Sequence, residues 1–416
     1  MKRMNRMNRN AVTLIEVIFS IGVVLIGLLG LLSLMPLAGK RSQEAISLAA
    51  ASALGDSVMN DLLSRRPITN GLLSDMGNAA VTYNTTTTPA QLQVGASPVG
   101  GICIDPIYKG NQAPLTSNHY NDRFFPYFVD THDPLLNPSE TGNDWPASQP
   151  RLRRVGANHT LAAPSVGRSE QARAIAESND ALTFERPKDR ADDAVLPGLK
   201  TNGSHLLSYG KRVPSGEYSW IATVCPLAGG RFASVSVVVV RNRDTERDYP
   251  SGLETVPLRN SVSERLAYVA DAAGFSGGAG GTVLLAGSQT TLSKLRSNDW
   301  VMLSTRVGFG TPPVDVHRWF RVVSVDNEPV LHRTTDTAPD IDSVLGGRVP
   351  TAVGADVWLR RVQLDGADWQ FGFLNDNPAP PFDSLTTAQR YSDNTYATIM
   401  TDVVSVTERV VPLSSL

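Results

Sequence analysis

The sequence is poor in the patterns that usually indicate catalysis or metal binding. Its six histidines are scattered, and none has metal-ligand spacing with a second histidine or a cysteine. The glycine-rich run Gly274–Gly281 lacks the Gly-Lys-Ser/Thr ending of a phosphate-binding loop. We therefore predict no catalytic residue, no metal and no cofactor, and we do not expect an enzyme.

Charge of one sign is also not in excess, since the formal net charge is −2. Nucleic-acid-binding proteins usually carry a basic patch, so no nucleic acid is predicted as a partner. The segment 130–133 could bind a metal, with a solvated loop as the favoured interpretation. Two acidic segments, 336–342 and 375–383, offer oxygen ligands that calcium accepts. Neither of them has EF-hand spacing, so surface turns are the favoured interpretation.

Cysteine is scarce, and Cys103 and Cys225 are the only two in the chain. Two cysteines of an exported protein could pair, but no spacing rule connects positions so far apart. Two interpretations stay open, a disulfide between them and two separate buried thiols.

What the chain does have is a basic leader followed by a long uncharged run. The leader carries Lys2, Arg3, Arg6 and Arg9, and Val17–Gly39 contains 23 residues without a charge. At about 1.5 Å per residue a helix of that length measures roughly 34 Å, enough to cross a bilayer. The run exceeds the roughly 7–15 apolar residues of a cleaved secretory signal. The basic leader favours a cytoplasmic N-terminus and an exported C-terminal part.

The segment at the start of this run resembles the processing signal of type IV pilins and type II secretion pseudopilins. That signal is a short basic leader, a small residue before the cut, an apolar residue, Thr, Leu, Ile, Glu and a long apolar helix. The matching residues here are Ala11, Val12, Thr13, Leu14, Ile15 and Glu16. The chain departs from the usual pattern at three positions, Ala11 for Gly, Val12 for Phe, and Ser33 where many members have a kinking Pro.

The resemblance implies cleavage after Ala11 by a prepilin peptidase and N-methylation of Val12. The new amine would lie four residues, or roughly one helical turn, from Glu16. Pairing of this carboxylate with the amine of a neighbouring subunit would lower the burial cost of both charges and favour assembly. The other interpretation is that Glu16 reaches the headgroups beneath an ordinary signal anchor.

By this resemblance the chain is expected to be a structural subunit of a type IV pilus-like or type II secretion pseudopilus filament. The implied partners are other pilin or pseudopilin subunits, prepilin peptidase, an inner-membrane assembly platform and the lipid bilayer. The implied location is the inner (cytoplasmic) membrane, single-pass, with the head in the periplasm or outside the cell. A head of about 350 residues is bulky for close packing, which favours a minor or tip component. The alternative is a signal-anchored extracytoplasmic binding module that never enters a filament.

The predicted fold class is α+β, a long N-terminal hydrophobic spine helix followed by a large, antiparallel, β-rich head. Apolar residues recur at three- and four-residue spacing after the uncharged run, which extends the predicted helix as an amphipathic segment. The predicted divisions are a leader at 1–11, the helix at 12–66, and head parts at 67–255 and 256–416, with a polar excursion at 137–193.

Alternating apolar and polar residues predict the strands of the head, most clearly a hairpin of Ser219–Cys225 and Phe232–Arg241. Further strands are predicted at Val301–Leu303, Trp319–Val325, Val357–Leu364 and Ala397–Val411. One head helix is predicted at Val262–Ala273, because Ser261 and Glu264 have capping-box spacing. The aromatic and arginine runs 317–320 and 358–361 favour strand edges, with a partner surface as the alternative.

Overall fold

The computed structural model describes residues 14–75, 79–87, 90–106, 116–117, 120–121, 123–126, 150–157, 182–184, 212–214, 218–227, 230–241, 243, 264–275, 277–307, 314–333, 356–369 and 395–416. The chain divides into two units, Met1–Ala50 and Ala51–Leu416. We call the second unit the body.

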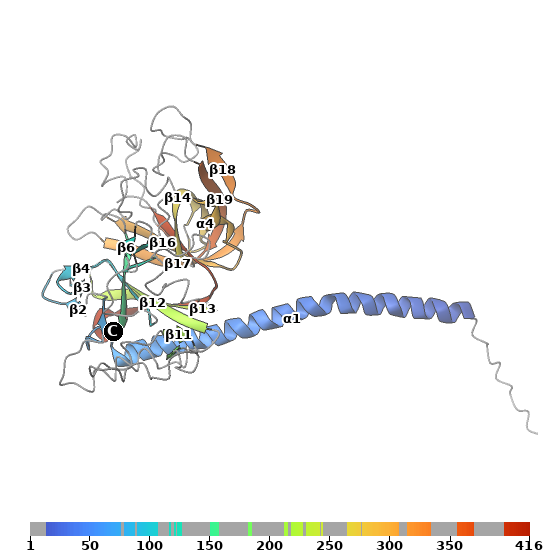
Figure 1. The fold of residues 1–416 in the computed structure, drawn as a ribbon, viewed down its shortest axis with the longest axis horizontal. Coiled ribbons are helices and arrows are strands. Elements are labelled where there is room, and N and C mark those ends of the chain that lie inside the picture. Colours follow the sequence, from blue (N-terminus) through green and yellow to red (C-terminus); the bar gives the residue numbers. More distant parts are fainter. Residues whose placement is uncertain are drawn as a thin grey trace, which may run out of the picture. The chain divides into compact units, whose positions relative to one another are not determined.

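Helix α1 runs from Leu14 to Arg65, 52 residues, and contributes to both units (Figure 1). Its sequence is rich in Leu, Ala and Val, and Pro36 lies within it. The helix ends where Arg66 takes a positive φ of 50° and Pro67 follows, because neither continues a regular α-helix.

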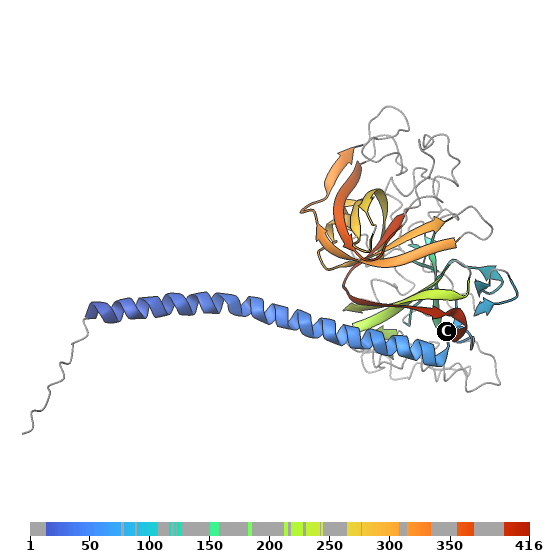
Figure 2. The ribbon, with the colours of Figure 1, turned by 180° about the vertical axis from the view of Figure 1, so that it is seen from behind.

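The first large sheet of the body, which we call sheet 1, has six strands in its main order and a seventh at its side. The order is β1 (Leu73–Ser74), β9 (Leu152–Ala157), β5 (Ile102–Ile104), β12 (Tyr218–Pro226), β13 (Phe232–Arg241) and β21 (Val403–Pro412), and β8 (Phe124–Phe125) pairs with β9. All pairs are antiparallel except β5 with β9. Figure 2 shows the dark red strand β21 beside the yellow-green β13.

The second large sheet closes on itself, so we call it the closed sheet. Its strands follow the order β15 (Gly281–Gly287), β14 (Glu264–Gly274), β20 (Tyr396–Met400), β16 (Trp300–Val307), β17 (Val314–Val325), β19 (Asp356–Asp365) and β18 (Val330–Arg333). Because β15 also pairs with β19, six antiparallel strands form a ring.

Smaller pieces complete the described structure. They are the sheet of β2 (Val81–Asn84), β3 (Gln91–Val94) and β4 (Ser97–Pro98), the pairs β6 (Thr116–Ser117) with β7 (Tyr120–Asn121) and β10 (Leu182–Phe184) with β11 (Arg212–Pro214), helix α4 (Gln289–Ser293) and the 3₁₀ turn η4 (Leu413–Ser415).

Sheet 1 is covered on both faces within the body. On one face Val58 and Leu62 of α1 pack against Val235 and Val237. The opposite face contributes Cys103, Ile221 and Val238 to a core shared with the closed sheet, which supplies Met302, Trp319 and Met400. Burying each large apolar side chain contributes about 1.5–3 kcal/mol, so this shared core holds the two sheets together.

The interior of the closed sheet is apolar. Inward residues such as Leu303, Phe320 and Leu364 are fully buried, and α4 adds Leu292 at one end of the ring. Arg360 fixes the chain there, because its guanidinium donates to the carbonyls of Leu292 and Leu295 and its Nε donates to that of Asp326.

The predicted fold class, α+β with a long N-terminal hydrophobic spine helix, is wrong. The body is built from β-sheets, and α1 gives its core only residues from Ala51 onward. Among the described helices, none combines the length and the apolar character that crossing a membrane would require.

The predicted head helix Val262–Ala273 is also wrong, since Glu264–Gly274 forms β14. Pairing with β15 and β20 and burial of the residues Leu266, Tyr268 and Ala270 outweigh the local capping signal. The predicted polar excursion at 137–193 contains β9, which lies inside sheet 1. The polar residues of β9 are Arg153 and Arg154, and both form ion pairs within the body.

The predicted hairpin is confirmed as β12 and β13, and the strands at 301–303, 319–325 and 357–364 lie within β16, β17 and β19. The single strand predicted at Ala397–Val411 is two strands, β20 and β21, separated at Asp402, which has a positive φ of 62°. The break lets the chain pass from the closed sheet back to sheet 1.

Candidate functional site

The residues of the N-terminal motif lie partly outside the described chain. Ala11, Val12 and Thr13 are not among the described residues. Leu14 and Ile15 open α1 with side chains 80% and 76% exposed, and Glu16 is exposed in the first helical turn. Negative charge at that position interacts favourably with the helix dipole.

The part of α1 before Ala51 has exposed large apolar side chains throughout Leu14–Met35, and the polar residues 40–44 separate these from Ile46 and Leu48. Exposed examples are Phe19 at 75%, Ile26 at 74% and Ile46 at 66%. A helix that is apolar on every side is normally buried, and an exposed apolar surface of this size marks an interaction site or a membrane contact. This segment therefore needs a covering that the chain itself does not supply within the described residues.

A second candidate is a groove of about 590 Å³ in the body, between the closed sheet and strand β21. The closed sheet contributes Trp300, Arg318, Trp319 and Arg321, and β21 contributes Glu408 and Arg409. Among the described strands, β21 is the last in the order of sheet 1, and the groove lies beside it. Aromatic and arginine side chains of this kind are typical of binding surfaces.

The groove runs along the edge of β21. Glu408 lies on one face of the strand, since its carboxylate accepts a 2.7 Å hydrogen bond from Ser234. Arg409 lies on the opposite face, since its guanidinium pairs with Asp56 of α1 at 3.2 Å. Both residues line the groove, so the groove passes the strand edge between them.

The charged groups of the groove are unevenly neutralised. Arg318 forms an ion pair with Glu408 at 3.6 Å. Arg321 is exposed and donates to the side-chain oxygen of Asn298 at 2.9 Å, a neutral partner. Trp319 is buried at the base, and its indole N–H donates to Thr223.

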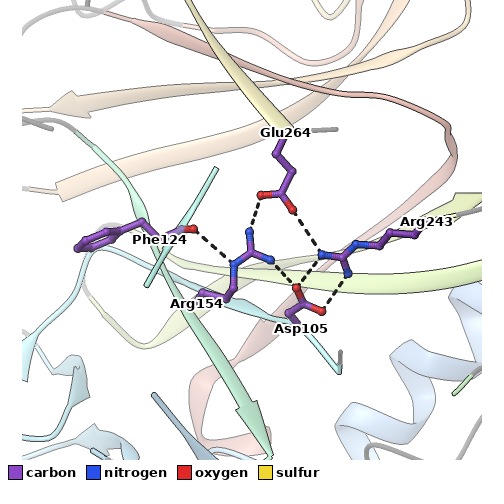
Figure 3. Close-up of polar contacts among 5 residues, drawn as sticks. All are labelled: Asp105, Phe124, Arg154, Arg243 and Glu264. Carbon is purple, nitrogen blue, oxygen red and sulfur yellow. Dashed lines mark hydrogen bonds and ion pairs between the residues drawn. The ribbon is translucent and has the colours of Figure 1, made fainter. Parts of the chain in front are cut away.

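Four charged side chains form a buried cluster between sheet 1 and the closed sheet (Figure 3). Arg154 of β9 donates to Asp105 and to Glu264 of β14. Arg243 donates to both oxygens of Asp105, at 2.9 and 2.8 Å, and contacts Glu264 at 3.4 Å. All four side chains are fully buried.

Among the described residues, the cluster pairs two guanidinium groups with two carboxylates. Its residues come from β9, from the end of β5, from the end of β13 and from β14, so it joins the two sheets. Buried ion pairs of this type hold a specific arrangement, and losing one partner is costly. We interpret the cluster as structural, because its four side chains are fully buried and link strands of the two sheets.

A serine and a histidine also meet in the body. Ser304 of β16 and His317 of β17 are cross-strand partners, with 2.8 Å between Oγ and Nδ1. Both are buried, and His317 shares its face of β17 with Trp319, which packs against sheet 1. A substrate has no access to this pair in that arrangement, so it offers no hydrolytic site.

The glycine-rich run Gly274–Gly281 connects β14 and β15 as an antiparallel hairpin. Its first residues also match the Gly-x-Ser-x-Gly spacing of a hydrolase nucleophile turn, which requires a strand followed by a helix. The hairpin excludes that turn and a phosphate-binding loop alike. Across the part of the chain that the structure describes, no group of three metal-ligating side chains occurs. The acidic segments 130–133, 336–342 and 375–383 lie outside that part.

Cys103 and Cys225 are free thiols, so the disulfide interpretation does not hold in this structure. Cys103 of β5 lies opposite Thr223 of β12, and Cys225 follows Thr223 by two residues in β12. The two cysteines are therefore diagonal neighbours. Such diagonal positions have Cα atoms about 7–8 Å apart, beyond the usual reach of a disulfide. Burial raises the pKa of both thiols, which makes them unreactive.

No protein-family model matches this chain, and neither a curated protein nor a solved structure is significantly similar to it. Relatives therefore do not indicate which of these surfaces is functional.

Sequence reasoning singled out Arg318 and Trp319 as part of an alternative partner surface, and the structure places both in the groove. It missed Glu408 and Arg409, which reach the groove only because β21 returns to sheet 1. It also missed the whole buried cluster, whose members are far apart in the sequence and carry no local signal.

Proposed function

We propose that this chain is a subunit of a type IV pilus-like or type II secretion pseudopilus filament, assembled through the N-terminal part of α1. The observation that carries the proposal is the exposed apolar surface that α1 presents from Leu14 onward, with the motif carboxylate Glu16 in its first turn. In a bundle of such helices each copy covers the apolar side chains of its neighbours, which removes them from water.

The proposed processing is cleavage after Ala11 by a prepilin peptidase and methylation of Val12. The amine of Val12 would then pair with Glu16 of a neighbouring subunit and set the register of the bundle. The partners are other pilin or pseudopilin subunits and an inner-membrane assembly platform. The location that follows is the inner membrane before assembly, with the body on the periplasmic side or outside the cell.

The body of this subunit is large beside a usual domain of about 100–150 residues. Large bodies crowd one another along a closely packed filament, so we place this chain as a minor or tip component. The body then supplies a surface at a low-copy position instead of the repeating wall of the filament.

The test compares Glu16→Ala with Glu44→Ala in a host with a working assembly system. Both residues are exposed carboxylates on α1, but only Glu16 belongs to the motif. We expect Glu16→Ala to reduce the chain in sheared filaments at least tenfold, and Glu44→Ala to leave it unchanged. Equal incorporation of the two variants would contradict the proposal and favour the signal-anchored binding module.

A further inference from the structure

The groove beside β21 has the features of a site for an extended peptide. We propose that it binds an acidic peptide segment of a partner protein, which adds as an antiparallel or parallel strand to the edge of β21. The inference does not depend on the filament role, because all the residues involved belong to the body.

The first argument is the backbone of β21. It is a ten-residue strand that pairs with β13, and within the described residues no strand pairs on its other side. An edge strand presents unpaired N–H and C=O groups, and peptides commonly bind by completing such an edge. At about 3.3 Å per residue, six peptide residues would cover roughly 20 Å of it.

The second argument is that the groove follows this edge. Glu408 and Arg409 point to opposite faces of β21 and still both line it. A peptide on the edge would therefore project alternate side chains toward the half-buried Trp300 and the buried Trp319. These indoles offer apolar contact area to the peptide.

The third argument is charge. The lining contains three arginines, Arg318, Arg321 and Arg409, against two carboxylates, Asp365 and Glu408. Arg318 and Arg409 are already in ion pairs, whereas the described partner of Arg321 is the neutral side chain of Asn298. A carboxylate on the peptide would form a charge-assisted hydrogen bond with Arg321.

The same charge argues against a second copy of this chain as the occupant. In a twofold dimer the same patch meets itself, so each groove would offer Arg321 of the other copy only Asp365 and Glu408, and Glu408 is already paired with Arg318. Like charges placed together in an interface are costly, whereas an acidic partner lowers the energy.

The test measures fluorescence anisotropy of two labelled decapeptides with the full chain in detergent. The first peptide alternates Glu with Val. The second has the same sequence with every backbone amide N-methylated, which removes the hydrogen-bond donors from both edges of the peptide strand. We expect the first to bind and the second to bind at least tenfold more weakly.

Two protein variants complete the test. Arg321→Glu should weaken binding of the first peptide at least tenfold, and Arg361→Glu should change it less than twofold. Arg361 is an exposed arginine of β19 outside the groove, so it controls for net charge. Equal binding of the two peptides, no response to Arg321→Glu, or a self-association that Arg321→Glu abolishes would each overturn the proposal.

Discussion

Replacing Glu264 with Gln removes one of the two carboxylates from the buried cluster between the sheets. The substitution keeps the size of the side chain and removes the carboxylate that both Arg154 and Arg243 contact. The cluster then has one negative charge fewer at a site where all four side chains are fully buried.

The expected cost follows from that burial. Breaking a buried ion pair by removing one partner costs about 3–5 kcal/mol, because the remaining charge stays desolvated. Such a loss lowers the equilibrium ratio of folded to unfolded chain about 10²- to 10⁴-fold. Arg154 and Glu264 contact each other directly, so Arg154→Met with Glu264→Gln should cost less than the sum of the single variants.

Urea unfolding followed by tryptophan fluorescence measures these differences in the free energy of unfolding. The matched control is Asp61→Asn, because Asp61 pairs with Arg65 at 3.8 Å on the helix surface and both side chains are 34% exposed. An exposed pair of that kind contributes at most about 0.5 kcal/mol. A Glu264→Gln variant no less stable than Asp61→Asn would refute the role given to the cluster.

Three further predictions concern other parts of the body. Cys103 and Cys225 should resist iodoacetamide at pH 8 in the folded chain and react in urea, because burial raises the pKa of both thiols; intact mass measures the labelling, and labelling of the native chain would contradict their burial. Burial raises the pKa of Asp299 from 3.8, so the folded chain binds more protons there than the unfolded chain once the pH exceeds that value. Stability should therefore fall relative to Asp299→Asn as the pH rises through the window above 3.8 and then stay level, and parallel pH profiles of the two urea midpoints would contradict this. Gly280→Ala should destabilise the β14–β15 hairpin by at least about 1 kcal/mol. The φ of Gly280 is +68°, and a Cβ there would lie 2.0 Å from the carbonyl oxygen of Leu364 in β19. An unchanged thermal midpoint would contradict that geometry.

The strands with regular alternation could be predicted from the sequence. Phe232–Arg241 was predicted with the bounds that β13 has, because Ser234–Val237 alternates, a run of valines follows and a turn precedes the segment. An alternating pattern can be seen within a short window of sequence, so a strand that has one can be predicted without knowing its partners.

The segment at Val262–Ala273 shows where local reasoning fails. Glu264 has the spacing of a helix capping box with Ser261, but in the structure its carboxylate binds Arg154 and Arg243. The preference for a strand comes from its two neighbours, β15, which follows across a hairpin, and β20, which lies far away in the chain. No window of the sequence around Glu264 contains that information.

The candidate sites also differ in how far local sequence predicts them. The N-terminal motif is continuous in sequence and could be identified there, although Ala11 and Val12 lie outside the described residues. The groove could be predicted only in part, because the return of β21 to sheet 1 brings Glu408 near Arg318 across 90 residues of chain. That return depends on the break at Asp402, which resembles an ordinary turn in the sequence.

The most direct test of the proposed filament role is the N-terminus of the chain extracted from a host with an active prepilin peptidase. Intact mass and N-terminal peptide analysis would identify it. The account predicts a chain that begins at N-methylated Val12. A chain that still begins at Met1 would contradict it.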